Sequence, residues 1–115
     1  MAPRFEGKTV RLGEGSYVIP ALSFRAVQRG YAEGWLTKVM AITQDGIPPT
    51  AEEMDALLEL GFAALSRNYP EITRDQALDL FDSRNIKVAA SAALALTLPD
   101  HLMENGAAEG EAKGP

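Results

Sequence analysis

The chain has 115 residues, a formal net charge of −5 at pH 7 and no cysteine. A single domain is expected at this length, and disulfide bonds and thiolate metal sites are excluded. No apolar run approaches the roughly 18 residues of a membrane helix, and the acidic balance argues against general binding of nucleic acid.

Charge is distributed unevenly along the chain. Residues 1–43 carry six basic and three acidic side chains, whereas residues 44–115 carry five basic and thirteen acidic ones. Such asymmetry can guide head-to-tail association or the choice of a partner through complementary potentials. Two solvated faces that differ only in charge are the simpler interpretation.

The N-terminal part predicts a β-hairpin. Thr9–Leu12 and Ser16–Ile19 are short runs of β-prone residues around the loop Gly13-Glu14-Gly15. A lone hairpin is only marginally stable in water, so we expect it to lie on the helices that follow.

Two short helices are predicted next. The first is expected to begin at Pro20 and to close at Gly34, because proline suits a first helical turn and glycine suits a C-cap. The second is expected from Trp35 to about Ile42. The segment Gln44–Pro49 then predicts a break.

Two capping boxes mark the best-defined helices. Thr50 with Glu53 opens a helix that is expected to end at Asn68, and Thr73 with Gln76 opens the next. The apolar residues expected to face inward from these two helices are Met54, Leu57, Leu58, Gly61, Phe62, Leu65, Ala77, Leu78 and Phe81.

The last predicted helix is capped by Asp82 or Ser83 and runs to about Leu98. Its middle, Val88–Leu96, has almost no polar face. A helix that is apolar all round is either central in a core or buried by another chain.

These elements predict a mainly α fold, a compact bundle of about four to five short helices with a small N-terminal β-hairpin. The expected divisions are a flexible N-terminus at 1–7, a single helical domain with an N-terminal hairpin at 8–100, and a disordered acidic, Gly- and Ala-rich tail at 101–115.

Catalytic chemistry is not expected. The single histidine, His101, has no partner nearby in sequence, and Gly13-Glu14-Gly15 lacks the later glycine of a dinucleotide loop. The carboxylates in 50–82 lack the spacing of a calcium loop. We therefore expect no catalytic residues, no metal, no cofactor and no enzyme activity.

The residues most suited to binding a partner are apolar or paired basic ones. On the last helix, small side chains allow close approach of a partner helix or of a second copy, which predicts a homo-oligomer. The paired arginines one turn apart can hold a carboxylate or a phosphate, or they form an ordinary polar face. The candidate residues are Ile86, Ala89, Ala93, Leu96, Phe24, Arg25 and Arg29.

The order of these elements resembles a known family. The hairpin leads into Tyr17–Phe24, a break at Ile47-Pro48-Pro49 precedes Thr50–Leu57, and "RNYPEIT" occupies Arg67–Thr73. Over roughly residues 8–98 the chain resembles the small tail assembly chaperones encoded just before the tape-measure gene in many long-tailed bacteriophages and prophages. The matching residues are fold and turn residues rather than a catalytic signature.

The resemblance implies a function. Such chaperones bind the long, helical, aggregation-prone tape-measure protein until the tail tube polymerises around it, and they are absent from the mature virion. Many are also made in a longer, frameshifted form that recruits the tail-tube protein. A location in the host bacterial cytoplasm is expected, with no membrane and no nucleic acid as partner.

Two other classes of protein remain open at this stage. A structural head–tail connector or tail-completion protein would use the charge asymmetry to form rings. A small DNA-binding regulator built on the helices at 50–82 is disfavoured by their acidity.

Overall fold

An antiparallel hairpin begins the fold, as predicted. In the computed structural model, which describes residues 5–42 and 49–98, β1 (Gly7–Leu12) pairs with β2 (Gly15–Pro20), and Leu12 lies opposite Gly15. The two-residue turn places Gly13 at φ +64°, a conformation that suits glycine and matches the twist of the strands.

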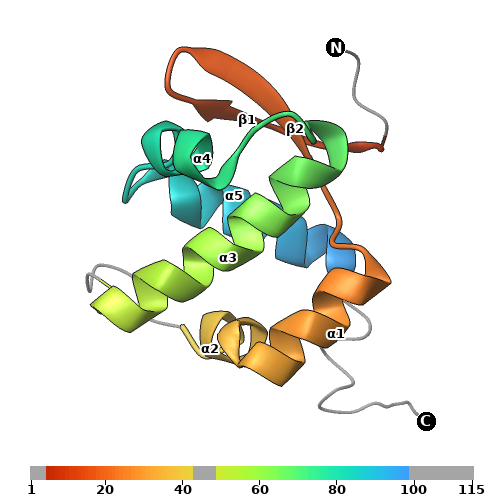
Figure 1. Ribbon diagram of the computed structural model, residues 1–115, viewed down its shortest axis with the longest axis vertical. Coiled ribbons are helices and arrows are strands. Elements are labelled where there is room, and N and C mark those ends of the chain that lie inside the picture. The colour runs from red at the N-terminus through yellow and green to blue at the C-terminus, as the bar shows by residue number, and fades with distance from the viewer. Residues whose placement is uncertain (1–4, 43–48, 99–115) are drawn as a thin grey trace, which may run out of the picture.

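Five helices follow among the described residues, which confirms the mainly α fold with an N-terminal hairpin (Figure 1). None of these helices is long and apolar enough to cross a membrane. The predicted tail at 101–115, with His101, and most of the predicted break at 44–49 lie outside the described residues. In chain order the helices are α1 (Phe24–Glu33), α2 (Trp35–Met40), α3 (Ala51–Asn68), α4 (Arg74–Leu80) and α5 (Asn85–Thr97).

The first helix begins later than the sequence predicted. Pro20 ends β2 instead of opening the helix, and the Ser23 hydroxyl caps α1 by accepting a hydrogen bond from the Ala26 backbone N–H at 3.1 Å. The reason is that the strand continues through Pro20 in register with Gly7. Gly34, at φ +89°, closes α1 as expected, and α2 follows directly.

Both predicted capping boxes are present. The Thr50 hydroxyl accepts from the Glu53 N–H, and the Glu53 carboxylate accepts from the Thr50 N–H. Thr73 and Gln76 repeat the arrangement at the start of α4. These short-range bonds satisfy helix N–H groups that otherwise lack partners.

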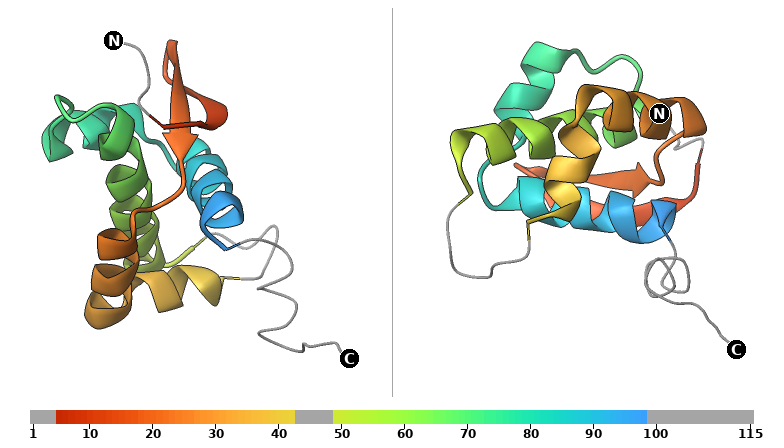
Figure 2. Two further views of the ribbon diagram at one scale, coloured as in Figure 1. Left: turned by 90° about the vertical axis from the view of Figure 1, so that its right-hand side faces the viewer. Right: turned by 90° about the horizontal axis from the view of Figure 1, so that it is seen from below.

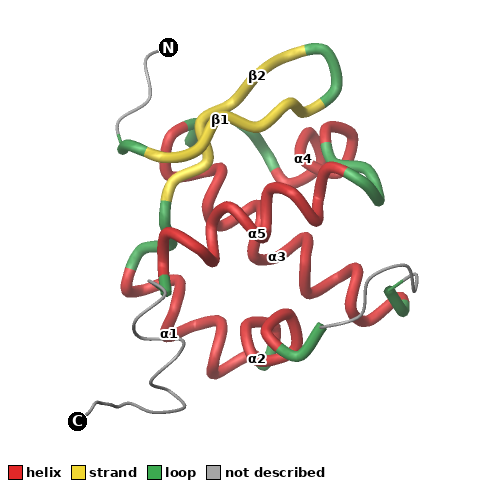
Figure 3. The backbone as a smooth tube through the Cα atoms, turned by 180° about the vertical axis from the view of Figure 1, so that it is seen from behind, coloured by secondary structure: helices red, strands yellow, loops and turns green. Residues whose placement is uncertain are grey.

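The core lies between the hairpin and two long helices. Figure 2 shows α3 and α5 on either side of the hairpin, and α3 contacts β2 while α5 contacts both strands and α3. Helices α1 and α2 lie on the opposite side from the hairpin, and α2 packs on α3 (Figure 3). The larger fully buried apolar side chains are those of Leu12, Ile19, Leu36, Leu60 and Leu65.

A buried amide joins the hairpin to the end of α3. The Asn68 side chain is fully buried; its amide nitrogen donates to the carbonyls of Phe5 and Val18, and its oxygen accepts from the Phe5 N–H. Next to it, the Tyr69 hydroxyl accepts from the Val18 N–H at 2.9 Å, and Arg67 lies 3.8 Å above the Phe5 ring. Three consecutive residues of the RNYPEIT stretch therefore hold the N-terminal segment on the helices.

We predict that Asn68→Ala lowers the free energy of unfolding by about 2–4 kcal/mol, because the buried amide and its three part-buried hydrogen bonds to Phe5 and Val18 are lost. Urea denaturation followed by circular dichroism measures this change. Ser66→Ala is the matched control, since the Ser66 hydroxyl bonds only within its own helix and its loss should stay within about 0.5 kcal/mol. Equal stability of the two variants would contradict this role of Asn68.

Candidate functional site

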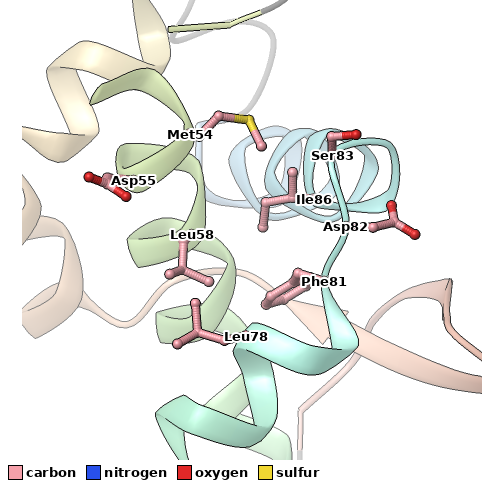
Figure 4. Close-up of a pocket in the computed structure, with 8 residues that line it drawn as sticks. All are labelled: Met54, Asp55, Leu58, Leu78, Phe81, Asp82, Ser83 and Ile86. Atoms are coloured by element: carbon pink, nitrogen blue, oxygen red, sulfur yellow. The ribbon is translucent and has the colours of Figure 1, made fainter. Parts of the chain in front are cut away.

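An open apolar groove lies where α3, α4 and the start of α5 meet. Its volume is about 300 Å³. Figure 4 shows five apolar side chains from these elements directed toward one space, while the carboxylates of Asp55 and Asp82 point away from it on opposite sides. The apolar residues that line the groove are Met54, Leu58, Leu78, Phe81 and Ile86.

The local sequence explains the shape of this groove. Met54 and Leu58 lie one turn apart on α3, and Phe81 and Ile86, which are 9% and 2% exposed, form its inner wall. Gly61 lets these two side chains approach α3 closely, because a Cβ there would lie 2.8 Å from Ile86 Cδ1.

Leu78 departs from the prediction that it faces inward. It is 51% exposed on α4, although Ala77 beside it is fully buried. Helix α4 has only seven residues, and among the elements it contacts chiefly α3. A short helix packed on one neighbour buries one narrow stripe, so Leu78 remains at the open side of the groove.

The rim of the groove is acidic. Asp55 and Asp82 contribute two carboxylates to the lining, and Arg74, which pairs with Glu59 outside it, interacts electrostatically with Asp55. The pKa of Asp82 lies below its ordinary value, first because the Asn85 backbone N–H bonds to its carboxylate and then because the Arg84 N–H does. The Asp82 carboxylate therefore caps the turn that leads into α5, whereas Arg84, the residue next to the regular helix, makes no side-chain cap bond.

Three of the predicted partner-binding residues are in the core, which corrects the sequence interpretation. Ile86 is 2% exposed, and Ala89 and Ala93 are fully buried. Helix α5 packs against α3 and both strands, so its small side chains serve close packing within the chain. A charge at Ala93 would disrupt this core, and of the four candidates on α5 only Leu96, 44% exposed, remains open to a partner.

The other predicted site residues lie on α1, and none of them lines the groove. Phe24 is 76% exposed, and Arg25 and Arg29 are exposed beside it. The α1 candidates therefore lie outside the groove, and the end of α5 approaches them through the Leu22 N–H, which donates to the Thr97 hydroxyl at 2.8 Å.

Of the apolar groove residues, Met54, Leu58, Leu78 and Phe81 are predicted to face inward and Ile86 to bind a partner. No sequence signal indicates that they leave an open groove.

The groove offers binding rather than reactive groups. Among the described residues that line it, Ser83 and the two aspartates are the polar ones, and no lysine or arginine accompanies them. Within residues 5–42 and 49–98, no group of three or more potential metal-ligating side chains comes together. This arrangement provides apolar contact for a side chain inserted into the groove, and the two aspartates beside it attract a positive charge.

Comparison with other proteins gives no further assignment. No protein-family model matches the chain, and searches of curated proteins and of solved structures found no match.

We predict that acid weakens the fold partly through Asp82. A carboxyl group with a lowered pKa in the folded state stabilises the protein above its unfolded pKa of about 3.9 and loses this effect as the pH falls through the folded pKa. Asp82→Asn keeps an acceptor oxygen but does not titrate, so its urea midpoint should fall less than that of the wild type between pH 5 and pH 2. The control Asp79→Asn, at an exposed position of α4, should follow the wild type. Identical curves for all three would contradict the capping role.

Proposed function

We propose that the chain is a tail assembly chaperone of a long-tailed bacteriophage or prophage, and that it binds a helical segment of the tape-measure protein. The observation that carries this proposal is the groove between α3, α4 and α5, where apolar side chains remain accessible beside two carboxylates. The resemblance of Tyr17–Phe24 and Arg67–Thr73 to that family supports it.

The groove fits the apolar face of a client helix. Leu78, half exposed, and the partly buried Met54 and Leu58 provide the contact surface, while Phe81 and Ile86 give it a firm inner wall. Burial of one large apolar side chain of the client contributes roughly 1.5–3 kcal/mol. Such contacts repeated along a long client keep it soluble by mass action, because each bound segment lowers the free aggregation-prone surface.

This mode of binding requires no chemistry from the chain. The client is released when tube subunits compete for the same apolar faces during polymerisation. The chaperone acts where the client is synthesised, in the bacterial cytoplasm, and stays out of the finished particle. A longer frameshifted form that recruits the tail-tube protein is part of the same proposal.

Mutation of the groove tests its place in the function. Co-expression of the chain with the tape-measure protein encoded nearest downstream should yield a soluble complex, measured by affinity pull-down and by the soluble fraction of the client. Leu78→Asp should weaken the complex at least about tenfold, since it removes one apolar contact and adds a negative charge.

Leu96→Asp is the matched control, because Leu96 is an exposed helical leucine outside the groove. It should leave the complex intact. If Leu96→Asp abolishes binding and Leu78→Asp does not, the client binds at the end of α5 instead of in the groove. An insoluble, unbound client with the wild-type chain would overturn the chaperone function itself.

A second candidate is a structural tail or connector protein that forms rings. The uneven charge along the chain favours it, because unlike patches on one subunit suit heterologous contacts that close into a ring. Purified virions distinguish the two functions. A connector is present in them in a fixed number of copies, whereas a chaperone is absent.

A further inference from the structure

The two strands of the hairpin differ in how their outer edges are bonded. At the outer edge of β2, Val18 donates its N–H to the Tyr69 hydroxyl and its carbonyl accepts from the Asn68 amide. Both backbone groups of Val18 therefore point away from β1. In an antiparallel pair, two opposite residues either bond to each other through their N–H and carbonyl groups, or both residues point these groups away from the partner strand.

The pairing of the strands shows that backbone groups of β1 also point outward. Thr9 lies opposite Val18, so the Thr9 N–H and carbonyl also point away from the hairpin, on the other side. Arg11, two residues along the strand, has the same orientation. Among the residues that the structure describes, none bonds to these outward groups. The outer edge of β1 is thus open to another strand.

Space for a strand exists beside this edge. A groove of about 510 Å³ runs between β1 and the outer face of α5. Val88, which is 53% exposed, offers an apolar contact, and small residues along α5 leave room for the backbone of an added strand. The residues that line this groove are Lys8, Thr9, Val10, Lys87, Val88, Ser91, Ala92 and Ala95.

The charge of this edge identifies the kind of partner. Lys8 and Lys87 line the groove and Arg11 follows on β1, and none of the three forms an ion pair within residues 5–42 and 49–98. A second copy of β1 would bring Lys8 and Arg11 against the same basic residues, which disfavours self-pairing. Residues 99–115 are acidic but contain no β-branched or aromatic residue, so they are poor strand formers.

We propose that the outer edge of β1 binds an extended acidic segment of a partner protein as a third strand. The backbone of Thr9 and Arg11 supplies the hydrogen bonds, Val88 contacts an apolar side chain of the segment, and Lys8 and Lys87 attract its carboxylates. This surface is separate from the groove at α3, α4 and α5, so the inference does not depend on the proposed chaperone function.

A synthetic peptide tests the edge directly. The probe is an acetylated, amidated seven-residue peptide in which Glu or Asp alternates with Val or Thr, added to the ¹⁵N-labelled full chain. We expect amide shifts centred on Thr9, Arg11 and Val88, and an affinity that falls as salt rises. The same peptide with alternate amides N-methylated cannot complete the ladder and should bind at least tenfold more weakly.

Substitution at one position separates backbone pairing from simple charge attraction. Thr9→Pro removes the outward N–H, and an edge strand tolerates proline where that group does not bond to its neighbour. It should reduce peptide affinity at least tenfold, whereas Thr9→Val, the control, retains the N–H and should bind like the wild type. Lys8→Glu should also weaken binding.

Several results would overturn the proposal. Strand addition by an acidic segment is excluded if the N-methylated and unmodified peptides bind equally well, or if neither binds. This comparison uses the wild-type chain, so it stays valid even if the Thr9→Pro variant does not fold. Tighter peptide binding after Asp100, Glu104, Glu109 and Glu111 are changed to Gln would assign the edge to the chain's own residues 99–115. A dimer in sedimentation that Thr9→Pro abolishes would assign it to a second copy.

Discussion

The fold depends on one buried amide at the end of α3. A two-stranded hairpin has too little apolar surface to be stable alone, so its position must be fixed by bonds to the helices. Asn68 provides them, because its amide bonds both to the approach to β1 at Phe5 and to the middle of β2 at Val18. A misplaced hairpin would leave these polar groups buried without partners, which makes the arrangement specific as well as stable.

This attachment determines which apolar surfaces are used inside the chain. Once β2 lies on α3, α5 fills the remaining space beside β1, and only small side chains such as Ala89 and Ala93 allow so close an approach. One apolar surface left for a partner is therefore at α4. That helix is too short to bury both of its apolar sides, and Leu78 stays accessible beside Met54 and Leu58.

The same attachment makes the two edges of the hairpin unequal. Asn68 and Tyr69 satisfy the outer edge of β2 with side chains, whereas β1 keeps an open edge flanked by basic residues. One small domain thus presents an acidic-rimmed apolar groove and, separately, a basic strand edge. The two surfaces suit partners of different conformation and charge, a helix in the first and an extended acidic segment in the second.

The sequence by itself determined the features that local chemistry controls. The two capping boxes, the Gly13 turn and the glycine that separates α1 from α2 depend on residues within a few positions of one another. The tertiary structure alone decided that Pro20 extends a strand and that the Asn68 side chain bonds to the hairpin. It also decided that α5 packs in the core of the chain and that Leu78 faces a groove. Each of these depends on which distant element lies alongside, and the spacing of residues along the chain does not carry that information.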